Sequence, residues 1–225
     1  MRSAEEFLKF IKENELKEDS TFNFKCDTCG KCCCNRNDII LSPYDIFRIA
    51  KYLKIETIDV VTKYCDVYIG RNSKIPICSV NFLGKRRECV FKKGRYCSIQ
   101  EVKPTVCALY PLGRAYNIEE KRFVYFRENT ACGQSNNPIL TKDWLENFKL
   151  KDSERYTILQ SELVLKIHKY LENKEIPEED FDRLEEMVYN LLYNGYDTDK
   201  DFYKQFEKRL HFFFFLIHYR NYNKT

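Results

Sequence analysis

Five cysteines crowd into nine residues near the start of the chain, in the order Cys26-Asp-Thr-Cys29-Gly-Lys-Cys32-Cys33-Cys34. The residues between them are turn formers, unlike the apolar neighbours of an ordinary buried free cysteine. Gly30 can take the positive φ that a tight loop needs. Two-residue gaps let such a loop aim successive sulfur atoms at one point, so the spacing predicts that these thiolates bind metal.

The spacing of the loop is compatible with more than one metal. Cys26, Cys29 and Cys32 match the first three ligands of the bacterial C-x2-C-x2-C run that holds a four-iron cluster. The same residues contain the C-x2-C half of a four-thiolate zinc site. A redox-active C-x-x-C pair is less favoured, because that motif does not call for further cysteines. Neighbouring side chains diverge, so Cys33 is expected to serve a second centre or to remain a spare thiol.

Six more cysteines follow, and four of them extend the pattern: Cys89, Cys97, Cys107 and Cys132. The middle two lie in Cys97-Ser-Ile-Gln-Glu-Val-Lys-Pro-Thr-Val-Cys107-Ala-Leu-Tyr-Pro111. Together with the loop, this stretch resembles the YkgJ-type cysteine-cluster family, whose hallmark is C-x-x-C-x-x-C-C followed by C-x-[IV]-[YH]-x-x-R-P-x-x-C-[RK]-x-[FY]-P. The resemblance covers residues 20 to 135 and departs from the family pattern at Gln100, Lys103 and Ala108, which leaves the thiolates untouched.

The resemblance implies a zinc- or iron-chelating domain related to the FliB flagellin lysine N-methylases. The expected metal ligands are Cys26, Cys29, Cys32, Cys33, Cys89, Cys97, Cys107 and Cys132. Eight thiolates are the count for two four-thiolate sites. An iron–sulfur cluster, a 4Fe–4S cluster first, is favoured over zinc, because zinc does not require a third cysteine at the spacing of the loop.

Two other functions stay open. The resemblance to the methylases would imply S-adenosylmethionine as cofactor and a protein lysine as substrate, so enzymatic activity is uncertain. The sequence has seven glycines and no glycine-rich loop after a strand of the kind that binds dinucleotide-like cofactors. The third alternative is a zinc-stabilised module that binds a protein or redox partner.

Composition limits the class of protein further. The 225 residues are 44% hydrophobic and 15% aromatic, which is ample for a packed core. The net charge is +4 with both signs interspersed, so nucleic-acid binding is not expected. No signal peptide and no membrane-spanning segment is expected, because no long apolar stretch occurs. We therefore expect a cytoplasmic protein with reduced thiols, and the odd count of eleven cysteines also favours metal over disulfides.

The pattern of apolar residues predicts an α+β fold that is mostly α. Residues 1–138 should form a small, metal-clamped cysteine-rich domain with short helices and strands, and residues 139–225 an α-helical extension packed on it. Helices are expected over 4–16, with Phe7, Leu8 and Ile11 on one face, and from Pro43 behind a Ser42 cap.

Other helices are expected over 58–68, after Pro104, and in stretches from Trp144, Tyr156, Glu175 and Asp199 onward. Cys65 and Cys78 are expected to be buried structural thiols, and the role of Cys34 stays open. The apolar run 212–217 should pack inward or meet a partner.

Overall fold

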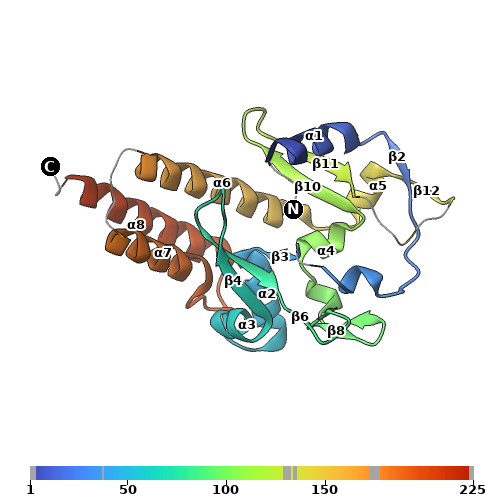
Figure 1. The fold of residues 1–225 in the computed structure, drawn as a ribbon, viewed down its shortest axis with the longest axis horizontal. Coiled ribbons are helices and arrows are strands. Elements are labelled where there is room, and N and C mark those ends of the chain that lie inside the picture. Colours follow the sequence, from blue (N-terminus) through green and yellow to red (C-terminus); the bar gives the residue numbers. More distant parts are fainter. Residues whose placement is uncertain (1–3, 37, 129–132, 134–135, 173–177, 223–225) are drawn as a thin grey trace.

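The computed structural model describes residues 4–36, 38–128, 133, 136–172 and 178–222 (Figure 1). It confirms an α+β fold that is mostly helical, with small sheets and a helical carboxyl-terminal part. The helices are α1 (Ala4–Asn14), α2 (Pro43–Leu53), α3 (Thr57–Tyr64), α4 (Thr105–Leu109), α5 (Thr141–Glu146), α6 (Leu150–Glu172), α7 (Glu178–Tyr193) and α8 (Phe202–Tyr222). None of these helices is long and apolar enough to cross a membrane.

The strands form five small antiparallel sheets. They are β1 (Glu15–Leu16), β2 (Thr21–Asn23), β3 (Ile40–Leu41), β4 (Cys65–Ile69), β5 (Pro76–Val80), β6 (Phe82–Leu83), β7 (Glu88–Cys89), β8 (Lys92–Lys93), β9 (Tyr96–Cys97), β10 (Leu112–Asn117), β11 (Arg122–Arg127) and β12 (Pro138–Leu140). The sheet orders are β1-β11-β10, β12-β2, β3-β5-β4, β6-β7 and β8-β9.

Helix α2 begins where the sequence predicts. The Ser42 hydroxyl accepts a hydrogen bond from the Asp45 amide at 3.0 Å, and the Asp45 carboxylate accepts one from the Ser42 amide at 3.2 Å. This reciprocal capping satisfies two backbone donors that the first helical turn leaves without partners. Pro43 occupies the first helical position, where its missing N–H costs nothing. Ile46 and Ile49 of this helix are almost completely buried, and both belong to the main core.

Two predictions of local structure are wrong. The helix expected over 58–68 ends at Tyr64, and the next five residues form β4, which pairs with β5 along its whole length. Pairing across a sheet overrides a helical periodicity that is only local. In α1, Ile11 is buried as expected, but it is Phe10 that joins it, while Leu8 is 66% exposed. The ring of Phe126 in β11 packs edge-on against both Phe7 and Phe10, each at 5.9 Å, so these two rings face the sheet and Leu8 does not.

One main core joins the cysteine-bearing half of the chain to the helical tail. The ring of Phe202 in α8 lies 5.4 Å from that of Tyr44 and 5.3 Å from that of Phe47, both on α2. The Tyr193 hydroxyl of α7 donates to the Pro76 carbonyl of β5 at 3.0 Å. Helices α6 to α8 lie beside one another and cover this core from one side (Figure 1). The helical tail and the cysteine-bearing half of the chain therefore share one core.

The predicted domain boundary after residue 138 remains a prediction. Strand β12 spans that position and pairs with β2, from Pro138 opposite Asn23 to Leu140 opposite Thr21. The apolar run of α8 faces inward only in part: Phe213 and Ile217 are buried, whereas Phe212 is 62% exposed.

Candidate metal centre

Seven of the eight cysteines predicted to bind metal line a single cavity of about 400 Å³. They are Cys26, Cys29, Cys32, Cys33, Cys89, Cys97 and Cys107, and all seven are free thiols. The eighth, Cys132, lies outside the described residues, although its neighbour Gly133 lines the same cavity. Side chains up to 81 residues apart in sequence, from Cys26 to Cys107, therefore share one space.

The cysteine loop takes its shape from its glycine. Gly30 has a φ of 69°, in the left-handed region, and precedes a single 3-10 turn over Lys31–Cys33. Two contacts fasten the end of this loop to the hairpin that carries Cys89. Cys34 forms an isolated β-bridge with Glu88, and the Asn35 amide donates to the Arg87 carbonyl at 2.8 Å. The loop is thus held against β7 by backbone hydrogen bonds.

Short hairpins and one helix bring the later cysteines to the cavity. Cys89 ends the hairpin of β6 and β7 and pairs with Phe82. Cys97 ends the hairpin of β8 and β9 and pairs with Lys92. Cys107 is the third residue of α4, which begins directly after Pro104. The sequence predicts this placement in the first turn of the helix. Each of these elements is too short to be stable alone, so their arrangement depends on the surrounding core.

Burial makes the free thiolate form costly in this cavity. Desolvation raises the pKa of Cys89, Cys97 and Cys107, and nearby thiolates raise the pKa of Cys107 further. The sulfur atoms of Cys32 and Cys33 lie 4.0 Å apart, and their hydrogen bond lowers the pKa of Cys32 while it raises that of Cys33. Several thiolates in one low-dielectric space need positive charge beside them, which a metal ion supplies.

Three cations also line the described part of the cavity, and two of them, Arg36 and Arg95, have no role in the sequence-based predictions. They are Arg36, Arg95 and Lys103, and the charges of Lys103 and Arg36 lower the pKa of Cys32. Four thiolates around a divalent ion carry a net charge of about −2, so cations in the wall suit such a centre. Only Lys103 had been noted, as a departure from the usual arginine of the family pattern.

The donor set fits a thiolate-bound metal in its chemistry. Soft sulfur ligands select zinc, copper(I) and iron–sulfur clusters over hard cations such as magnesium. The wall between the thiols is apolar, with Phe24, Phe91 and Ile99 all buried, which limits the access of water. Among the described residues, no three His, Cys, Asp or Glu side chains lie close enough together to hold an ion as they stand.

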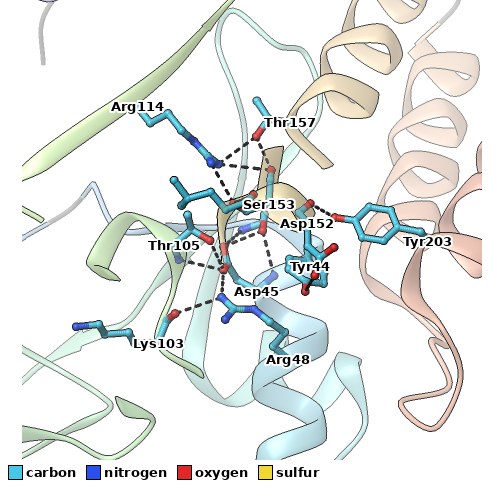
Figure 2. A network of polar contacts seen from close by, with 12 residues as sticks. Tyr44, Asp45, Arg48, Lys103, Thr105, Arg114, Asp152, Ser153, Thr157 and Tyr203 are labelled. Carbon is cyan, nitrogen blue, oxygen red and sulfur yellow. Dashed lines mark hydrogen bonds and ion pairs between the residues drawn. The ribbon is translucent and has the colours of Figure 1, made fainter. Parts of the chain in front are cut away.

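A buried carboxylate holds the helix that carries Cys107 (Figure 2). Oδ1 of Asp45 accepts hydrogen bonds from the Thr105 amide at 3.0 Å and from the Thr105 hydroxyl at 3.1 Å. Arg48 donates to the same oxygen at 2.6 Å and to the Lys103 carbonyl at 3.2 Å. Because Thr105 is the first residue of α4, Asp45 sets the position of this helix relative to α2.

Neighbouring contacts connect this region to the helical tail. The Tyr44 hydroxyl donates to the Asp152 carboxylate at 3.0 Å, and the Tyr203 hydroxyl donates to the Asp152 carbonyl (Figure 2). Arg114 of β10 donates to the Ser153 hydroxyl at 3.0 Å. The start of α6 is thereby joined to α2, to α8 and to the sheet of β10.

Replacing Asp45 by alanine is expected to lower the free energy of unfolding by about 3–5 kcal/mol, because Arg48 would lose its buried partner. The Asp45 side chain is 4% exposed and that of Arg48 is 27% exposed, so solvent can replace little of the pair. Urea denaturation would measure the change. The matched control is Asp59→Ala, which breaks an exposed pair with Lys63 and should cost at most about 1 kcal/mol. Equal costs for the two variants would contradict this role of Asp45.

The other three described cysteines and the histidines lie outside the cavity wall. Cys65 and Cys78 are buried in the main core, and Cys34 lines a separate hollow on the outer side of the loop. The carboxyl-terminal histidines His211 and His218 are exposed on α8, and His168 is partly buried on α6. No described histidine contributes to the cavity.

Residues 25–137 match the family CxxCxxCC, described as "Putative zinc- or iron-chelating domain". This match covers half of the chain. The chain belongs to this family. The CxxCxxCC match begins just before Cys26 and ends beyond Cys132, so it contains every cysteine of the predicted ligand set. The helical tail lies almost entirely beyond it.

A curated relative adds no function of its own. The uncharacterised protein MJ0661 of Methanocaldococcus jannaschii is 30% identical over 112 residues, which cover 46% of this chain and 54% of that protein. The chain thus spans about half the length of the curated relative that it matches. No solved structure matches the chain.

Proposed function

We propose that this member of the CxxCxxCC family holds an iron–sulfur cluster in the cavity of the seven thiols. The observation that carries the proposal is that Cys26, Cys29 and Cys32 line the same cavity as the later Cys89, Cys97 and Cys107, with Cys26 and Cys29 exposed to solvent. The first three have the spacing of a cluster-binding run, and the later cysteines offer the remaining thiolates. The description of the family, "Putative zinc- or iron-chelating domain", agrees with a metal in this cavity.

The size of the cavity favours a cluster over one zinc ion. Four sulfur ligands about 2.3 Å from a zinc ion enclose it without space for water. One water molecule occupies about 30 Å³ of liquid, so a cavity of about 400 Å³ has room for a much larger group. A cluster with several iron and sulfide ions, or two metal centres, would use this space.

The chain's own residues would shape the properties of such a group. A cluster bound here would supply one-electron transfer or a labile sensing site. The buried rings of Phe24 and Phe91 would keep water from the thiolates, and Lys103 and Arg36 would offset their negative charge. Asp45 would keep Cys107 in place through α4.

Purification without oxygen tests this proposal. The full chain is expected to be brown, with broad visible absorbance, and to contain iron and acid-labile sulfide in similar amounts. Dithionite should bleach the colour reversibly. A colourless protein that contains stoichiometric zinc and no sulfide would overturn the iron–sulfur proposal and would favour a closed structural zinc site.

A further inference from the structure

An open sheet edge with apolar side chains borders a groove that shares no lining residue with the metal cavity. In the sheet of order β3-β5-β4, strand β4 has a neighbour on one side only, among the described residues. Three consecutive side chains of β4 are exposed: Val67 by 41%, Tyr68 by 43% and Ile69 by 38%. Unpaired strand edges present free backbone donors and acceptors, and natural proteins usually blunt them with charge. This edge carries one exposed charge, Asp66, followed by the three apolar side chains.

The exposed strand forms one wall of a groove, and α7 forms the other. Val67 pairs directly with Cys78 of β5, so both side chains point to the same face of the sheet. That face is the one covered by α7, because the Tyr193 side chain of α7 contacts the fully buried Cys78. The groove has a volume of about 400 Å³. Its walls are Val67, Tyr68, Ile69 and Pro76 on the sheet and Asp182, Glu185, Glu186 and Tyr189 on α7.

The helical wall is negatively charged and lacks counter-ions. Within the described part of the chain, no ion pair joins Asp182, Glu185 or Glu186 to a cation. The neighbouring Arg183 is directed at Asp180, 3.9 Å away, on the same helix. A ligand for this groove should therefore combine an extended backbone with positive side chains.

We propose that the groove between β4 and α7 binds an extended, lysine- or arginine-bearing segment of a partner protein by strand addition. The segment would pair its backbone with the free edge of β4, as peptides do in β-augmentation. Alternate side chains of an added strand point to one face, so every second residue would lie toward Asp182, Glu185 and Glu186. The apolar residues between them would lie on the other face of the sheet, beside Tyr68, and the stems of the basic side chains would cover Val67 and Ile69.

A second copy of this chain is a poorer occupant. Edge-to-edge pairing of β4 with itself would bring Asp66 of each copy, and the acidic face of each α7, toward one another. Like charges placed opposite each other disfavour association. The charges of the groove therefore favour a basic partner over self-association.

Fluorescence anisotropy with the full chain tests the proposal. The probe is a fluorescein-labelled ten-residue peptide of alternating lysine and valine. It is expected to bind at least about tenfold more tightly than the same peptide with glutamate in place of lysine. A third peptide, N-methylated on the backbone amides of one edge, should lose about tenfold in affinity, because strand pairing needs those donors. Simple charge attraction would leave this third peptide unaffected.

Variants of the chain place the binding at the groove. Glu185→Lys with Glu186→Lys should weaken binding of the lysine peptide about tenfold, since the wall charge is reversed. The matched control, Glu18→Lys with Asp19→Lys, makes the same charge change at the exposed turn between β1 and β2 and should have little effect. Equal effects of the two double variants, equal binding of the N-methylated peptide, or no binding up to about 1 mM would each overturn the proposal. So would a dimer in light scattering that Val67→Lys dissociates, because the occupant would then be a second copy.

Discussion

Replacing Cys107 by serine is expected to lower the metal content of the purified chain at least about tenfold. Cys107 lines the cavity from α4, and a serine hydroxyl is a poor ligand for the soft metals that thiolates select. Metal links loops that are far apart in sequence, so the variant should also unfold at a lower temperature. Metal analysis and thermal denaturation on the same preparation would measure both effects.

Two controls make this prediction specific. Cys65→Ser changes a buried thiol outside the cavity, so it should cost about 1–3 kcal/mol for an unpaired hydroxyl and leave the metal in place. Serine variants of the neighbours Cys33 and Cys34 give a more closely matched comparison. Cys33 lines the cavity, whereas Cys34 lines a separate hollow. Cys33→Ser should lose metal and Cys34→Ser should retain it. Equal loss from both would contradict the division of the thiols.

Truncation after residue 139 is expected to cause aggregation even when metal is supplied. The tail contributes about half of the main core, including the fully buried Tyr156, Leu163 and Phe206. Removal of the tail would expose the apolar surface that these side chains cover, and large exposed apolar patches cause aggregation. Light scattering would detect the aggregates. A monodisperse, metal-loaded fragment would show that the cysteine half folds alone.

Two phenylalanine variants on α8 test the contribution of the tail to the core without truncation. Phe206 is fully buried, whereas Phe212 is 62% exposed on the same helix. Phe206→Ala should lower the free energy of unfolding by about 3–5 kcal/mol, as other large-to-small core changes do. Phe212→Ala should change it by at most about 0.5 kcal/mol. Urea denaturation compares the two, and similar values would contradict the packing of α8 described here.

The sequence predicts the local features of this fold better than the contacts between distant segments. The cap of α2 was predictable because Ser42 and Pro43 act on the helix that they begin. The position of Cys107 behind Pro104 was predictable for the same reason. Strand β4 was missed because its pairing partner, β5, lies beyond a turn, and the helical periodicity of 58–68 gives no sign of that partner.

The residues of the candidate site likewise fall into those that local sequence patterns predict and those that depend on contacts between distant segments. The C-x2-C spacing is a local signal, and it led directly to Cys26, Cys29 and Cys32. The bond from Asp45 to Thr105 spans 60 residues, and Asp45 looks in the sequence like an ordinary first-turn residue of a helix. The cavity-lining Arg36 and Arg95 carried no signal, since isolated arginines are common on surfaces.

X-ray absorption spectroscopy at the edge of the bound metal tests the central claim most directly. The full chain would be purified without oxygen and the element identified first, so the measurement applies to iron and to zinc alike. A centre built from the cavity cysteines predicts a first coordination shell made only of sulfur, at about 2.3 Å. For a cluster, metal–metal scattering should appear as well, and it should vanish with the metal in Cys107→Ser. A first shell dominated by nitrogen or oxygen would contradict the account, because histidines or a carboxylate such as Asp27 in the cavity wall would then have to replace the thiolates.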